Sequence, residues 1–126
     1  MSDLLCLSGT GRLLKDGVVL FNPVEALTSV TARGRGLLGR PTLPDGHAVL
    51  LAPCRAIHTW FMCFRLDVAF LDANLVVTRL CRGVKTFRMA WGPRNACATL
   101  EWRAGWLPAA ALAEGDRLVW QNAGPA

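Results

Sequence analysis

The sequence predicts a mainly β fold, a sandwich or barrel-like antiparallel sheet with one main helix and a short second helix. From residue 47 onward, short segments rich in Val, Leu, Phe and Trp alternate with turn residues, which is typical of strands. Several of these segments are apolar at both alternating positions, a pattern that favours strands covered on both faces. The predicted strands are 47–53, 58–64, 66–72, 75–82, 96–103 and 116–121.

The N-terminal region is expected to contribute a β-hairpin. Asp16-Gly17 separates the apolar runs 12–15 and 18–21, and an Asp-Gly pair in that position is a strong signal for a two-residue turn. We therefore expect strands near residues 4–7, 11–15 and 18–21.

The main helix is predicted over residues 23–38. Asn22 suits an N-cap, Pro23 suits the first helical position, and Glu25 adds an acidic side chain to the first turn. Gly39 and Pro41 are expected to end this helix. The second helix is predicted over about 106–113, before Gly115.

The composition predicts one domain with a substantial core. The chain has 126 residues, of which 52% are hydrophobic and 18% are charged, so much of it must be buried. Residues 1–126 are taken as this single domain, with 122–126 as a loose tail. Because the chain has neither an apolar run long enough to span a membrane nor the basic and apolar regions of a signal peptide, we expect a cytoplasmic location without a membrane span.

The cysteines and the charge argue against a disulfide-stabilised protein and against nucleic-acid binding by the local arginine cluster. The five cysteines are odd in number and share no CxxC spacing, which favours free thiols over a disulfide framework. The net charge of +5 comes from scattered arginines, with one local cluster at Arg33, Arg35 and Arg40. No stacking aromatics are interleaved with that cluster, so we do not expect nucleic-acid binding from it.

Five short motifs occur in an order and at a spacing that are familiar. They read RGLLGR (35–40), IHTWFM (57–62), LDVAFLD (66–72), LEWRAG (100–105) and GDRL (115–118). Together they resemble the prokaryotic family catalogued as domain of unknown function 192, over about 90 residues from Thr28 to Val119. The resemblance implies a compact β-sandwich or barrel-like fold with one main helix, and it implies no known reaction. Arg65 departs from the family pattern, in which a proline is expected at this position.

Three polar side chains inside apolar strands are candidate catalytic residues. They are His58, Asp67 and Glu101, and Arg33 and Arg40 are candidate ligand-binding residues that could neutralise the acids. Buried charges need partners, so one interpretation is a structural network that locks the fold. The alternative is a pocket in which His58 acts as a general base, oriented by an acidic partner.

The sequence offers two weaker candidate sites. Cys54, His58 and Met62 are spaced by four, as a soft metal would require on a helix. In an extended strand, positions 58 and 62 are about 13 Å apart, so no metal site is expected. Trp91, next to Gly92 and Pro93, is the tryptophan expected to make an exposed ligand contact.

No sequence motif supplies a reaction or a cofactor, and no cofactor is expected. The leading hypothesis is a small, non-catalytic binding or accessory protein whose partner is an unknown small molecule or protein. One alternative is a small hydrolase or isomerase that uses His58 as general base. The other is a polyanion-binding module, which rests only on the charge.

Overall fold

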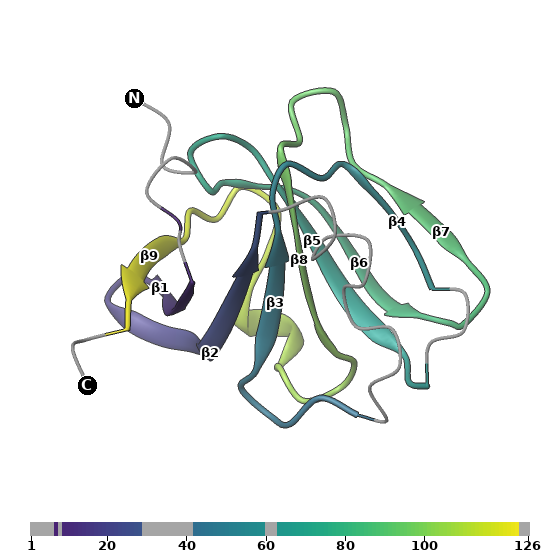
Figure 1. The fold of residues 1–126 in the computed structure, drawn as a ribbon, viewed down its shortest axis with the longest axis horizontal. Helices are drawn as coiled ribbons and strands as arrows, with labels where there is room; N and C mark the ends of the chain where they lie inside the picture. Colours follow the sequence, from purple (N-terminus) through teal and green to yellow (C-terminus); the bar gives the residue numbers. More distant parts are fainter. Residues whose placement is uncertain (1–6, 8, 29–41, 60–62, 124–126) are drawn as a thin grey trace.

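The computed structural model describes residues 7, 9–28, 42–59 and 63–123, and these residues form two β-sheets (Figure 1). The larger sheet has seven strands in the order β6-β5-β8-β3-β2-β1-β9, and the smaller sheet pairs β4 with β7. The strands are β1 (Thr10–Lys15), β2 (Val18–Leu27), β3 (Ala48–Leu51), β4 (Ala56–His58), β5 (Leu66–Leu71), β6 (Val77–Val84), β7 (Met89–Trp91), β8 (Ala98–Arg103) and β9 (Val119–Asn122).

The seven-stranded sheet is mixed rather than purely antiparallel. Only β2 and β3 are parallel, with Val24 opposite Ala48, and the other described pairs are antiparallel. The N-terminal hairpin is confirmed: β1 pairs with β2 across Asp16 and Gly17, which both have positive φ. Two positive φ angles characterise the turn type that matches the twist of paired strands.

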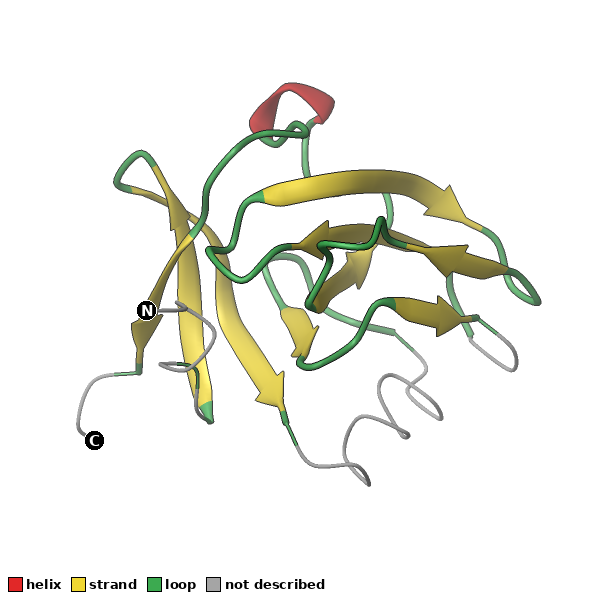
Figure 2. Ribbon diagram, turned by 90° about the horizontal axis from the view of Figure 1, so that it is seen from above, coloured by secondary structure: helices red, strands yellow, loops and turns green. Residues whose placement is uncertain are grey.

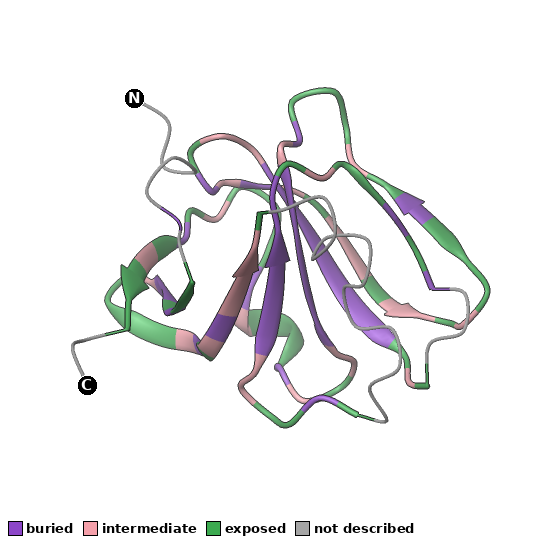
Figure 3. Ribbon diagram, viewed as in Figure 1, coloured by how far each residue is buried: buried purple, intermediate pink, exposed green. Residues whose placement is uncertain are grey.

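Each face of the seven-stranded sheet carries its own core, and the central strands β3, β5 and β8 are buried throughout most of their length (Figure 3). In the large core, Phe21 and Trp102 pack with ring centroids 4.9 Å apart. The large core also contains Leu7, Leu13, Val24, Ala48, Leu50, Ala52, Ala69, Leu71, Leu75, Val77, Ala98, Leu100, Leu107, Leu112 and Leu118. The small core, on the opposite face, contains Leu43, Val49, Leu51, Ile57, Leu66, Val68, Phe70, Ala90 and Ala96.

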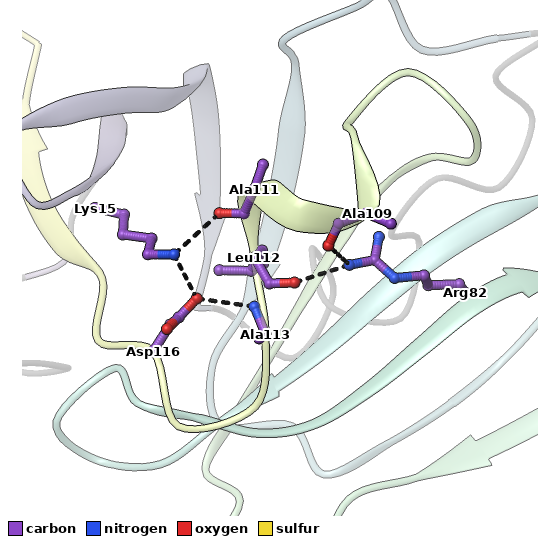
Figure 4. Close-up of polar contacts among 7 residues, drawn as sticks. All are labelled: Lys15, Arg82, Ala109, Ala111, Leu112, Ala113 and Asp116. Atoms are coloured by element: carbon purple, nitrogen blue, oxygen red, sulfur yellow. Dashed lines mark hydrogen bonds and ion pairs between the residues drawn. The ribbon is translucent and has the colours of Figure 1, made fainter.

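The segment 109–116 connects β1 with β6, the edge strand on the other side of the large sheet (Figure 4). On the β1 side, the Lys15 ammonium lies 2.8 Å from a carboxylate oxygen of Asp116. On the β6 side, the Arg82 guanidinium donates to the carbonyls of Ala109 and Leu112 at 3.0 and 2.8 Å. These contacts hold segment 109–116 against the large core. The edge strands β6 and β9 are not paired with one another, so the sheet is not a closed barrel.

The predicted main helix over residues 23–38 is wrong. Residues 23–27 belong to β2, and residues 29–38 lie outside the described residues. The Asn22-Pro23 signal was overridden by pairing: Phe21 lies opposite Leu13 and Val24 lies opposite Gly11, and both apolar side chains are fully buried. Burying Phe21 and Val24 in the large core stabilises this segment more than a helix cap of about 1 kcal/mol would.

The predicted second helix over 106–113 is also wrong. Within the described residues, the only helical segment is a short 3-10 turn, η2 (Ala109–Ala111), visible in Figure 2. Pro108 precedes this turn in an extended conformation, and Leu112 follows it in an extended conformation. Because Leu112 is fully buried in the large core, the chain must turn inward there instead of continuing a helix.

Two further expectations lie partly beyond the described chain. Of the strand predicted near residues 4–7, only Leu7 is described, and it lies outside the strands. The loose tail over 122–126 stays a prediction, because Asn122 ends β9 and residues 124–126 are not described. In the described part, no helix has the length and apolarity needed to cross a membrane.

Candidate functional site

The candidate site lies between two strands that follow one another in sequence without pairing. β6 pairs with β5, whereas β7 pairs with β4, with Ile57 opposite Ala90 and His58 opposite Met89. The four residues 85–88 that join β6 to β7 are short enough for a hairpin. The two strands diverge instead, and this opens a hollow between them.

Thr59 forms hydrogen bonds to the connection between β6 and β7. Its side chain is fully buried, and its hydroxyl donates to the Lys85 carbonyl at 2.6 Å and accepts from the Arg88 amide at 2.9 Å. The Thr59 amide donates to the Arg88 carbonyl at 2.8 Å, and the Phe87 amide donates to the Thr59 carbonyl at 3.2 Å. The connection between β6 and β7 is therefore bonded to the end of β4, away from β6.

The hollow has a volume of about 430 Å³, within the range of small-molecule sites. Its lining includes Arg79 and Cys81 of β6, Lys85 and Arg88 of the connection, and Trp91 of β7. None of its described lining residues is acidic. Three cations that share one hollow without a carboxylate create a positive potential, and such a potential attracts anions.

Arg79 is held at one end of the hollow. Its Nη1 donates to the Trp91 carbonyl at 2.6 Å, a contact that bridges β6 and β7. A guanidinium has five N–H donors, so most of the Arg79 donors are not used by this bond. This geometry suits an arginine that both fixes the strands and binds an anionic group.

The backbone of β7 adds a further donor. Gly92 and Arg88 form hydrogen bonds with the β4 side, through the carbonyl of Arg55 and the amide of Thr59. Because antiparallel ladders alternate, the backbone groups of the intervening Met89 point away from β4. The Met89 amide is therefore directed toward the side of β7 that carries the hollow.

The three candidate catalytic residues lie on different surfaces of the fold. His58 is an exposed residue of β4, and its neighbour Ile57 packs into the small core, so His58 points outward from that core. Asp67 lies opposite Trp102 and faces the large core, whereas Glu101 lies opposite Val68 and faces the small core. The two buried acids are thus separated by the sheet itself.

Glu101 is buried in an apolar environment. Its exposed fraction is 5%, and its neighbours in register are Val49 and Val68. Across the described part of the chain, no hydrogen bond or ion pair to its carboxylate is found. Burial disfavours the charged form and raises the pKa of Glu101 to about 7.

Asp67 has a structural role in the sheet. Its carboxylate accepts from the Gly83 amide at 2.7 Å, at the position where the register between β5 and β6 shifts. A register shift leaves a backbone donor without its ladder partner, and Asp67 satisfies that donor. Gly83 is also one of the β6 residues that line the hollow.

The weaker candidates are only partly described. Arg33, Arg40 and Met62 lie outside the described residues. The Cys54 thiol donates to the Ala56 carbonyl at 3.2 Å, and the described part of the chain contains no cluster of three His, Cys, Asp or Glu side chains suited to a metal. Trp91 is half-exposed, at 54%, and lines the hollow.

Sequence reasoning did not select Arg79, Lys85 or Arg88. A signal for two of them was present, because residues 85–91 read KTFRMAW, with cations and apolar rings in alternation. The sequence predicts no strand between residues 82 and 96, so β7 is a feature that only the structure reveals. The convergence with Arg79 could not be read from the sequence, since it depends on the divergence of β6 from β7.

Comparisons with known proteins place the chain in a family. The model of the family DUF192, described as an uncharacterized ACR, matches residues 14–120. The chain belongs to the DUF192 family. No curated protein matches the chain.

Two solved structures share the DUF192 chain's fold. A protein of unknown function from Novosphingobium aromaticivorans superposes with a TM-score of 0.75 at 16% identity, covering 88% of this chain and 84% of that one. A protein from Sinorhizobium meliloti, described as a "putative transcription regulator", has a TM-score of 0.73 at 19% identity, covering 88% of this chain and 92% of that one. At these identities the likeness establishes the fold alone.

Proposed function

We propose that this DUF192 protein is a non-catalytic binding protein whose hollow between β6 and β7 takes an anionic ligand. The observation that carries the proposal is the convergence of Arg79, Lys85 and Arg88 on one hollow whose described lining has no acidic residue. Arg79 is fixed by the Trp91 carbonyl, so its guanidinium is oriented before a ligand arrives. Pre-organised donors bind anions more strongly because less ordering is required on binding.

A binding role accounts for the site better than acid–base catalysis does. A general base must lie within hydrogen-bond reach of its substrate and be oriented by a partner. Here His58 faces outward from β4, while Asp67 and Glu101 are buried on opposite faces of the large sheet. The hollow itself offers cations, a thiol and apolar surface.

Inorganic tripolyphosphate provides a direct test, because it carries charge without any apolar group. We expect calorimetric binding at low salt that weakens as salt is added. A double substitution, Lys85→Gln with Arg88→Gln, should weaken binding by about tenfold, since charge-assisted hydrogen bonds contribute roughly 1 kcal/mol or more.

The matched control is Arg12→Gln, alone and combined with Arg117→Gln. Arg12 is exposed on β1, at the opposite end of the large sheet, and its Nε donates to Gln121 at 2.8 Å. The control pair removes the same number of charges from residues that do not line the hollow. If it weakens binding as much as the Lys85 and Arg88 pair, or if the native protein does not bind tripolyphosphate, the proposal is wrong.

A further inference from the structure

One stretch of the sequence carries basic side chains and no acidic ones. Residues 73–100 contain five of the 14 Lys and Arg side chains and none of the nine Asp and Glu side chains. This stretch holds β6, β7 and the connection between them, together with the start of β8. The five cations are Arg79, Arg82, Lys85, Arg88 and Arg94. Three of them, Arg79, Lys85 and Arg88, line the hollow, whose described lining has no acid. Such a positive site attracts a polymer of the opposite sign over a distance of about a Debye length.

Large apolar side chains are exposed on the same stretch. Phe87, Met89 and Trp91 have exposed fractions of 59%, 49% and 54%. Met89 and Trp91 are two residues apart on β7, so they share one face of the strand about 7 Å apart. Ala90 between them is buried in the small core. The apolar side chains therefore face outward beside the cationic hollow, and Met89 and Trp91 also line it.

Alternating cations and aromatic rings characterise sites for single-stranded nucleic acids. Such sites combine a positive groove that follows the phosphates with rings on which bases stack. Lys85, Phe87, Arg88 and Trp91 supply both parts within seven residues, and Arg79 extends the positive surface onto β6. The arginine cluster at 33–40 lacks such rings, so it gives no comparable reason to expect this ligand.

We propose that the surface formed by β6, β7 and their connection binds single-stranded nucleic acid, with phosphates at the hollow and a base stacked on Trp91. This inference rests on the proposed function, because it names the anion that the hollow takes. A membrane surface fits less well, since a flat bilayer does not enter a hollow. An acidic peptide would satisfy the cations but would leave the exposed rings of Phe87 and Trp91 without planar partners.

The experiment compares two labelled strands of about twelve nucleotides, a length within the range of known single-strand sites. One is oligothymidylate and the other is an abasic strand of equal length and charge. Fluorescence anisotropy should show about tenfold tighter binding of oligothymidylate, because stacking of one base strengthens binding by roughly that factor. Trp91→Ala should abolish this difference, whereas Trp91→Phe should retain most of it.

Two further variants separate stacking from charge. Lys85→Gln should weaken both strands and lower the slope of log affinity against log salt by about 0.7, the value for one lost phosphate contact. Val119→Ala, which trims an exposed apolar side chain on β9, should leave both affinities unchanged. Urea unfolding midpoints of the variants confirm that each remains folded.

Several results would overturn the inference. Equal affinity for the two strands would exclude base stacking. Binding of tripolyphosphate without binding of either oligonucleotide would exclude nucleic acid as the ligand. Neither result would contradict the proposed anion site. Tighter binding to phosphatidylserine vesicles or to a poly-glutamate peptide at the same salt would assign the surface to that partner. If tripolyphosphate also fails to bind, the proposed function and this inference fall together.

Discussion

The two faces of the seven-stranded sheet are built differently. The large core contains two aromatic rings in contact, and the segment 109–116 packs over it. The small core has fewer residues and borders the diverging strands β6 and β7. It lies over the Glu101 carboxyl, for which the described residues supply no hydrogen-bond partner. The two faces also differ in their buried acid: Asp67 on the large-core side accepts a hydrogen bond from Gly83, whereas Glu101 on the small-core side lies among valines next to the candidate site. Functional sites commonly occur where packing rules are broken in this way.

The largest expected effect comes from the large core. Trp102 is fully buried and contacts Phe21, so Trp102→Ala should lower the free energy of unfolding by about 3–5 kcal/mol. The indole N–H of Trp102 has no hydrogen-bond acceptor within the described chain, so Trp102→Phe, which keeps an aromatic ring, should lower it much less. Urea unfolding measures both. Equal losses for the two variants would contradict the view that packing at Trp102 dominates.

A buried acid should make the small core sensitive to pH. Glu101 has a raised pKa of about 7 in the folded protein and an ordinary value of 4.5 when unfolded. Its favourable contribution is complete below about pH 4.5 and is lost as the pH rises through 7, because the unfolded chain then ionises more easily. Glu101→Gln should therefore stabilise the protein by up to about 3 kcal/mol at pH 8 and by little at pH 4.

Urea unfolding at several pH values tests this sign. The native protein should lose stability between pH 5 and pH 8, and the Glu101→Gln variant should lose less over the same range. Asp116 does not confound the comparison: its hydrogen bond with Lys15 lowers its pKa, so it stays ionised throughout this window. A native stability that rises from pH 5 to pH 8, or a destabilised variant at pH 8, would show that Glu101 is ionised and partnered.

The smallest expected effect comes from the connection between β6 and β7. Thr59→Val keeps the shape of the side chain but removes the hydroxyl that bonds Lys85 and Arg88, which should lower stability by about 1–2 kcal/mol. Because the same bonds hold the hollow open, tripolyphosphate affinity should fall as well. Thr59→Ser keeps the hydroxyl and is the matched control. Unchanged affinity in the Thr59→Val variant would mean that the hollow does not depend on this connection.

The sequence by itself determined the mainly β class, the Asp16-Gly17 hairpin, the strands at β3, β5, β6 and β8, and membership of a family with no assigned reaction. It also predicted that Trp91 is exposed and that Asp67 and Glu101 are buried, and both are confirmed. These features depend on the residues of a local turn and on the pattern of apolar and polar residues along one strand. Both can be read directly from a sequence.

Only the tertiary structure decided the rest. Asn22-Pro23 carries a local helix signal, yet burial of Phe21 and Val24 against distant strands made that segment a strand. The hollow arises because β7 pairs with β4 instead of its sequence neighbour β6, which brings Arg79 to Trp91 and places Lys85 and Arg88 beside them. Such pairings join residues far apart in the chain, and their free energy depends on packing in three dimensions that local propensity does not contain.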